Sequence, residues 1–194
     1  LYADVLDADE PATAEEFRNA VDGWLPEELD EDWTVVAESP RVVRTYRRLP
    51  PEAKEAILPP VLELTNGMAE FVERHADSGG LRIQTLDELE EYCWYVAGTV
   101  GSLVTGLVTR GTTDRRESRL RENARSFGLL LQLVNVAKDV SDDYHEENNV
   151  YLPAEWLESE GVDRDAVCDP ENEEAVATVI ERVVDHASGY LDDT

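Results

Sequence analysis

The sequence predicts an all-α fold, and two observations support that prediction. Apolar residues recur at helical spacing along most of the 194-residue chain, and no alternating run bounded by turn residues is typical of a strand. Proline and glycine pairs such as Pro50–Pro51 and Gly79–Gly80 divide this pattern into segments. With 42% hydrophobic residues the chain can bury a core, so we expect one domain over residues 1–194 rather than a disordered polypeptide.

Seven helical segments are expected in chain order. Their approximate ranges are 13–25, 35–48, 51–78, 86–110, 114–147, a short helix after Pro153, and 172–190. Thr13 and Glu16 have the spacing of a capping box at the start of the first segment. Pro40 is expected to interrupt the second, and Pro59 with Pro60 to kink the third, because proline lacks the helical N–H donor and clashes with the preceding turn.

The fourth segment contains 18 residues without a formal charge, from Tyr92 to Thr109. That length is the lower limit for a transmembrane helix. Its glycines and hydroxyl residues make it only weakly hydrophobic. We therefore expect a buried central helix with close neighbours rather than a membrane span.

The charge balance excludes one class of partner and indicates an environment. Asp and Glu number 44 against 17 Lys and Arg, which gives a net charge of −27 that repels nucleic acid. Only Lys54 and Lys138 are lysines, and an acidic, lysine-poor surface suits a salt-rich cytoplasm. Cys93 and Cys168 form no secreted disulfide pattern, which favours a reducing compartment. We expect a cytoplasmic halophilic protein, with an ordinary acidic protein as the alternative.

Polar residues recur at three- and four-residue steps along one face of the helix expected over 114–147. They are Gln132, Asn135, Asp139, Asp142 and Asp143. Buried amides and carboxylates are costly unless paired, so this stripe indicates a polar ligand or a cation. Asp139 and Asp143, one turn apart, can share Mg²⁺ or Mn²⁺, and Mg²⁺ commonly keeps waters and substrate phosphates as ligands. The alternative is that the helix simply emerges into solvent here.

A second candidate element is one face of the uncharged segment. Its residues are Tyr92, Val96, Val100 (or Thr99) and Leu103. Gly98 and Gly101 would let a helix or a ligand approach this face. Tyr92 would place a hydroxyl at the end of an apolar groove; the alternative is a core tyrosine bonded to a backbone carbonyl.

Three segments together resemble the squalene and phytoene synthase family in order and separation: GMAEFVERH (67–75), YCWYVAGTVG (92–101) and GLLLQLVNVAKDVSDDYHEENNVYLPAEWL (128–157). The resemblance covers roughly residues 35–190 and implies the all-α isoprenoid synthase fold, with helices around a central apolar cavity. It also implies head-to-head condensation of two prenyl diphosphates through a cyclopropylcarbinyl diphosphate. Two farnesyl diphosphates giving squalene through presqualene diphosphate are favoured, and phytoene synthesis from geranylgeranyl diphosphate is the alternative.

The resemblance further implies roles for individual residues. Asp139 and Asp143, with Asp142 where Glu is usual, would hold Mg²⁺ on a substrate diphosphate. Tyr92 would act on protons or stabilise a carbocation. The isoprenoid tail pocket would be lined by Val96, Val100, Gly101, Ala124, Phe127 and Leu131, and further substrate contacts would come from Gln132, Asn135 and Lys138. NADPH is implied only if the product is squalene, and product release implies peripheral contact with a membrane.

The sequence departs from the family pattern at three places. Lys138 and Asn149 each stand where the family commonly has Arg, which weakens diphosphate contacts because neither side chain reproduces the planar guanidinium. The first aspartate-rich motif should lie upstream, and Asp4, Asp7 and Asp9 match it poorly because Pro11 follows at once. We therefore expect a truncated version that lacks some family helices at both ends, with a non-catalytic helical remnant as the alternative.

Overall fold

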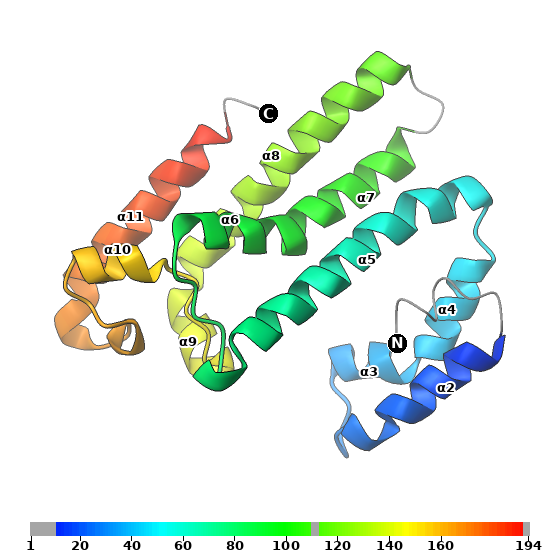
Figure 1. Cartoon of the computed structure of the whole chain (residues 1–194), viewed down its shortest axis with the longest axis horizontal. Helices are drawn as coiled ribbons and strands as arrows, with labels where there is room; N and C mark the ends of the chain where they lie inside the picture. Colours follow the sequence, from blue (N-terminus) through cyan, green and yellow to red (C-terminus); the bar gives the residue numbers. More distant parts are fainter. Residues whose placement is uncertain (1–10, 110–112, 192–194) are drawn as a thin grey trace. The chain divides into compact units, whose positions relative to one another are not determined.

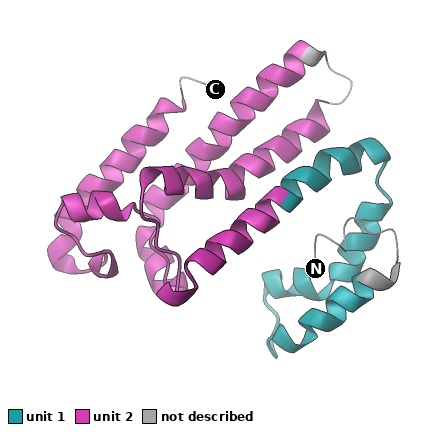
Figure 2. Ribbon diagram, in the orientation of Figure 1, with its two compact units in different colours: residues 1–62 teal, residues 63–194 magenta. Residues whose placement is uncertain are grey.

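The structure is a computed structural model that describes residues 11–109 and 113–191. Within those ranges the chain is helical, and its sole β-type pairing is an isolated bridge between Arg82 and Val150, which confirms the all-α prediction. Two compact units follow each other along the chain, residues 1–62 and residues 63–194 (Figure 2). Helix α5 (Pro51–Arg74) begins in the first unit and ends in the second. The expectation of one domain stays a prediction.

The first unit contains three described helices before α5. They are α2 (Pro11–Val21), α3 (Glu31–Ala37) and α4 (Ser39–Arg47), with a 3₁₀ turn η1 (Asp22–Trp24) after α2. The expected helix over residues 13–25 therefore ends earlier, at Val21. Asp30 caps α3 by accepting a hydrogen bond from the Trp33 backbone N–H at 2.8 Å. The predicted interruption near Pro40 is confirmed, because α3 ends at Ala37 and Pro40 lies in the first turn of α4.

A small apolar cluster holds the first unit together. Ala14 on α2 and Val43 on α4 are fully buried. Phe17, Tyr46, Leu58 and Val61 pack around them. The start of α5 therefore belongs to this cluster, and burial of these side chains stabilises the contact between α2 and α4.

The second unit is built around one long helix, α8 (Asp114–Lys138). The remaining helices are α6 (Leu86–Cys93), η3 (Trp94–Gly98), α7 (Thr99–Val108), α9 (Val140–Glu147), α10 (Ala154–Ser159) and α11 (Glu173–Gly189), with 3₁₀ turns η2 (Ala76–Ser78), η4 (Arg164–Ala166) and η5 (Pro170–Asn172). Helix α8 contacts α6, η3, α7 and α11, as Figure 1 shows for α7 and α11. Its buried residues Leu129, Leu133 and Val136 are the centre of the unit's core. The short helix after Pro153 and the final helix lie where the sequence predicts them.

Two helices that the sequence predicts as continuous are interrupted. The helix expected over residues 86–110 contains a π-helical turn, η3, between α6 and α7, where the Thr99 hydroxyl donates to the Tyr95 carbonyl at 2.6 Å. The helix expected over residues 114–147 breaks at Asp139, whose φ and ψ are −102° and 14°. The backbone N–H of Asp143 still donates to the Asp139 carbonyl at 2.8 Å, so these two aspartates remain one turn apart.

Buried Arg82 joins three loops of the second unit. Its guanidinium donates to the carbonyl oxygens of Leu81 and Asn148, to the Asn148 Oδ1 at 2.8 Å and to an Asp165 carboxylate oxygen at 3.1 Å. Asn148 ends α9 in the left-handed conformation, with φ of 56°, which asparagine tolerates better than most residues. The segment after α9 is therefore fixed against the loop before α6.

No helix within the described ranges combines the length and the apolar character that crossing a bilayer requires.

Candidate active site

An apolar groove of about 350 Å³ lies between η3 and α7 on one side and α8 on the other. It is lined by Val96, Ala97, Val100, Gly101, Val104, Thr105, Ala124, Phe127, Gly128 and Leu131. All six residues predicted to line an isoprenoid tail pocket, residues 96, 100, 101, 124, 127 and 131, are among them. Helical spacing places the residues of each wall on one face, because each helix contributes residues three or four positions apart, and the packing of α8 against η3 and α7 brings the two faces together.

Glycines allow the two walls of the groove to approach closely. A Cβ atom on Gly101 would lie 2.7 Å from the Ala124 carbonyl oxygen, and one on Gly128 would lie 2.9 Å from the Ala97 carbonyl oxygen. Large side chains on the same walls remain open to solvent: Phe127 is 52% exposed and Leu131 is 48% exposed. A contiguous exposed apolar surface of this kind is typical of a binding site.

The polar residues predicted for the site come after the groove residues in the sequence, at the end of α8 and in α9. Gln132 is half-buried and Asn135 is exposed, and beyond them Asp139 and Asp143 are half-buried while Asp142 is exposed. The interpretation of this stripe as buried is therefore wrong for Asn135 and Asp142. For Asp142 the break at Asp139 is the reason, because the chain turns there at the margin of the core; Asn135 precedes the break, on an exposed part of α8.

Asp143 lies in a concentration of negative charge. Burial, together with the carboxylates of Glu147, Asp139 and Asp142, raises the pKa of Asp143 from 3.8 to about 6. Among the described residues none supplies Asp143 with a side-chain hydrogen bond or an ion pair. A partly buried carboxylate with like-charged neighbours is stabilised by a cation.

Asp139 and Asp143 have the chemistry that Mg²⁺ requires, although they cannot hold it alone. Mg²⁺ is bound by one or two carboxylates, and waters and substrate phosphates complete its octahedral shell. Within the described ranges no group of three or more His, Cys, Asp or Glu side chains is arranged as a metal site. Two carboxylates would be enough only for a Mg²⁺ ion whose remaining ligands came from water and a bound ligand.

Tyr92 is a core residue and does not line the groove. It is 7% exposed, its ring stacks on Tyr151 with centroids 4.7 Å apart, and Phe71 meets it edge-on at 5.9 Å. The expected position at the end of the groove is thus wrong. The hydroxyls of Tyr92 and Tyr151 are hydrogen-bonded to each other, and burial is the main cause that raises the pKa of Tyr92 above its usual range. Asp143 contributes to this rise, and Asp143 lines the same small hollow as Tyr151, the neighbour of Tyr92.

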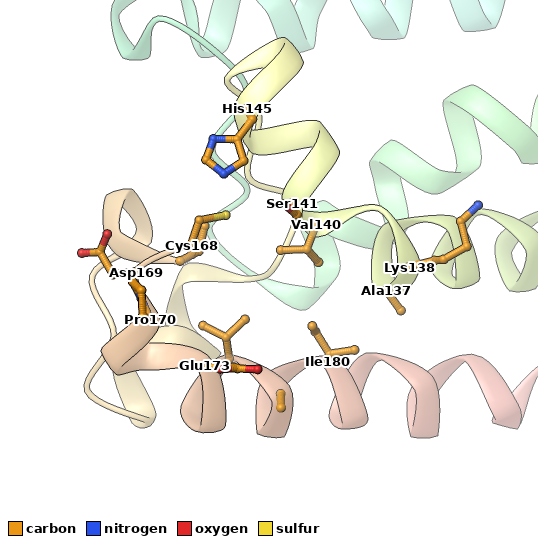
Figure 3. Close-up of a pocket in the computed structure, with 13 residues that line it drawn as sticks. Ala137, Lys138, Val140, Ser141, His145, Cys168, Asp169, Pro170, Glu173 and Ile180 are labelled. Carbon is orange, nitrogen blue, oxygen red and sulfur yellow. The ribbon is translucent and has the colours of Figure 1, made fainter.

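Lys138 lies at a different hollow, a groove of about 530 Å³ between the α8–α9 junction and α11 (Figure 3). Both apolar and polar side chains line this groove. The apolar ones include Val140, Val167, Val176 and Ile180, and the others include Lys138, Ser141, His145, Cys168, Asp169 and Glu173. In Figure 3 the Lys138 side chain extends away from Cys168 and Ile180. Its ammonium lies 3.2 Å from the carboxylate of half-buried Asp139; because Lys138 is exposed the pair contributes little stability, but it places one cation beside the aspartates.

Tyr151 also belongs to this region, although the sequence does not assign it to the site, and it lies beside Asn149, which stands where the family commonly has Arg. Tyr151 contacts Tyr92, and Asn149 donates to the Tyr151 hydroxyl at 3.0 Å. The NVYLP segment contains both, but nothing in its spacing indicates a partner in the distant α6. Asp4, Asp7 and Asp9, considered for the first aspartate-rich motif, lie outside the described residues.

Comparison with known proteins identifies the family. The model of the squalene/phytoene synthase family matches residues 2–194. A 15-cis-phytoene synthase from Enterobacter agglomerans is 38% identical over 109 residues, which are 56% of this chain and 35% of that protein. A squalene synthase from Candida albicans is 29% identical over 178 residues, which are 89% of this chain and 39% of that protein.

A solved structure of TcSQS in complex with a ligand has the same fold. It superposes with a TM-score of 0.74 at 25% identity, over 97% of this chain and 54% of that chain. The predicted isoprenoid synthase fold is thereby confirmed. The chain spans 35–39% of the length of the two curated relatives. By its sequence and its fold, this chain belongs to the squalene/phytoene synthase family of all-α prenyltransferases.

Proposed function

We propose that this chain condenses two prenyl diphosphates head-to-head. The observation that carries the proposal is the order of chemical groups along α8: an apolar groove that includes Leu131, then Gln132 and Asn135, then Asp139 and Asp143. At 1.5 Å per residue, Leu131 and Asp139 are about 12 Å apart along the helix axis. A molecule with an apolar tail and an anionic head can contact both ends of this arrangement.

Each part of the site would make a distinct contribution. Asp139 and Asp143, with exposed Asp142 beside them, would hold Mg²⁺ or Mn²⁺ against a diphosphate. The bound metal would neutralise the charge that develops on the leaving group. The apolar walls of the groove would exclude water from cationic carbon. Gln132, Asn135 and Lys138 would contact the substrate between tail and diphosphate.

Two products are candidates. Squalene from two farnesyl diphosphates, through presqualene diphosphate and with NADPH as reductant, is the product that the YCWYVAG and GMAEF segments favour. Phytoene from two geranylgeranyl diphosphates is the second candidate, because the phytoene synthase relative has the higher identity, 38% against 29%. The requirement for NADPH remains a prediction tied to squalene.

Product analysis tests the proposal. The chain is incubated in high salt and Mg²⁺ with farnesyl or geranylgeranyl diphosphate, with and without NADPH, and the hydrocarbon is extracted and identified. We expect squalene from farnesyl diphosphate; phytoene from geranylgeranyl diphosphate alone would select the second candidate. Failure to release pyrophosphate or form hydrocarbon from either substrate, by a chain with an intact helical spectrum, would favour the non-catalytic remnant.

Two variants connect the product to the site. Asp139→Ala and Tyr92→Phe should each lose most of the product while circular dichroism still reports a helical fold. The first removes a carboxylate from the diphosphate end, and the second removes the phenol hydroxyl that Tyr151 holds. Wild-type rates in either variant would remove that residue from the mechanism.

A further inference from the structure

In the core of the second unit, Tyr92 packs against a second tyrosine, Tyr151. The two rings stack with centroids 4.7 Å apart and an interplanar angle of 27°, and the Tyr92 and Tyr151 hydroxyls are hydrogen-bonded to each other. The phenol therefore has one fixed neighbour that contacts both its ring and its oxygen. A hydroxyl held in this way has a single preferred orientation, because rotating the O–H away would break a buried hydrogen bond.

Tyr151 is itself held by Asn149. The Asn149 amide nitrogen donates to the Tyr151 hydroxyl at 3.0 Å and to a Glu147 carboxylate oxygen at 2.9 Å. The Asn149 carbonyl oxygen accepts the Leu81 backbone N–H at 2.7 Å. Each polar atom of the Asn149 side chain is thus engaged within the protein, at the position where the family pattern commonly has Arg.

Hydrogen bonds to the loop before α6 fix the segment that contains Asn149 and Tyr151. The backbone of Val150 pairs with both Leu81 and Ile83, and Arg82 bonds Asn148 through its carbonyl oxygen and its side chain. Tyr151 and Leu152, which follow, are both buried. Tyr151 is therefore a rigid support rather than a mobile side chain.

We propose that Tyr151, held by Asn149, is a positioning residue that fixes the hydroxyl of Tyr92 near the Asp143 end of the site. The inference rests on the proposed condensation, in which Tyr92 acts on a proton or on cationic carbon. Tyr151 acts through Tyr92. The role is specific to the hydroxyl oxygen, since the ring stacking alone would leave the Tyr92 O–H free to turn.

The test variant is Tyr151→Phe in the full chain. Phenylalanine keeps the stacked ring and removes only the hydroxyl that is hydrogen-bonded to Tyr92. Tyr190→Phe is the matched control, because it also deletes a phenol hydroxyl bonded within the protein, to Glu90 at 2.6 Å, but on α11. Asn149→Ala is the second variant, which leaves Tyr151 in place without its donor.

Two readouts distinguish positioning from a general structural role. Proton NMR should show a slowly exchanging hydroxyl resonance, assigned to Tyr92 by its disappearance in Tyr92→Phe, that is lost in Tyr151→Phe and kept in Tyr190→Phe. In turnover assays kcat should fall by about 10- to 100-fold in Tyr151→Phe, with KM changed less than about 3-fold, because a misplaced group affects the chemical step rather than substrate binding. Asn149→Ala should give a smaller fall in kcat.

The opposite results would overturn the inference. A Tyr92 hydroxyl resonance unchanged in Tyr151→Phe would show that Tyr151 does not hold it, whether or not the chain turns over. Turnover of Tyr151→Phe within about 2-fold of wild type would show that holding it is irrelevant to the chemistry. Absence of turnover in the wild type would contradict the proposed condensation instead, and the NMR result would still decide whether Tyr151 orients Tyr92.

Discussion

At the scale of single residues, Asp143 is the most informative side chain of the site. Its charge is opposed by burial and by three neighbouring carboxylates, and no described side chain offers it a compensating cation. Such an arrangement is unfavourable for stability in the free protein. Under the proposed function it would become favourable on binding of a divalent cation and a diphosphate, because the cation would remove the repulsion.

This interpretation predicts a pH-dependent stability difference between wild type and Asp143→Asn. The folded-state pKa of about 6 is above the ordinary value of 3.8, so the destabilising charge is absent at low pH and fully present above about pH 6. Without divalent cations, Asp143→Asn should therefore be more stable than wild type at pH 8, by up to about 1 kcal/mol after solvent screening. The difference should vanish as pH falls below 4. Thermal unfolding at constant salt measures it.

Mg²⁺ supplies the control for that measurement. The ion should raise the unfolding temperature of wild type at pH 8 and have a smaller effect on Asp143→Asn, because binding requires the ionised carboxylate. A variant less stable than wild type at pH 8 would contradict this account of Asp143.

Some residues of the site could be predicted from the sequence and others could not. Val96, Val100 and Leu131 lie in the groove because helical spacing fixes which residues share a face. The position of Tyr92 depends on its contact with Tyr151, and no local pattern encodes a contact between such distant segments. The residues that local periodicity governs were therefore predictable, and the orientation of the phenol was not.

At the scale of elements, the close contact between α8 and the η3–α7 wall depends on Gly128. Its Cβ position is within 3.0 Å of backbone atoms of Ala97 and Gly98, which cannot move as a flexible side chain would. The same contact closes one side of the apolar groove.

Gly128→Ala should therefore destabilise the protein by about 1–3 kcal/mol, despite the better helix propensity of alanine, because the two walls must separate. Gly189→Ala is the matched control: a Cβ there meets nothing within 4 Å, so stability should stay equal or rise by up to about 1 kcal/mol. Urea unfolding at constant salt compares the two. Equal free energies of unfolding for Gly128→Ala and wild type would mean that α8 and the η3–α7 wall can separate without cost.

Helix existence and the interruption at Pro40 were predictable, whereas the interruptions at Trp94–Gly98 and at Asp139 were not. Apolar periodicity fixes α8 and α11, but the π turn at Trp94–Gly98 depends on tertiary contacts that spacing does not encode. The Trp94 indole donates to Glu63 at 2.8 Å, and the Arg125 guanidinium lies 4.6 Å from the Trp94 ring centroid. The break at Asp139 likewise occurs within an unbroken run of helical spacing.

At the scale of the whole molecule, the net charge of −27 is the dominant property. Mutual repulsion of this size destabilises a compact chain unless salt screens it. Of the basic residues, 17 in all, several are already committed to ion pairs, such as Arg74 with Glu88 and Glu91. The adaptation to high salt remains a prediction from composition.

Dialysis into dilute buffer tests the predicted adaptation to high salt. We expect the helical circular dichroism spectrum to collapse at low salt and to return when molar salt is restored, because screening rather than specific pairing offsets the repulsion. An unchanged spectrum in dilute buffer would identify an ordinary acidic protein.

The central claim is that Asp139 and Asp143 hold a metal-bound diphosphate at the end of the apolar groove. The most direct test is the initial rate of pyrophosphate release from farnesyl diphosphate as Mg²⁺ is titrated, for wild type, Asp139→Asn and the exposed control Asp185→Asn on α11. We predict that release requires Mg²⁺, falls at least about 100-fold in Asp139→Asn and is unchanged in Asp185→Asn. Metal-independent release, or equal rates for Asp139→Asn and wild type, would contradict the claim.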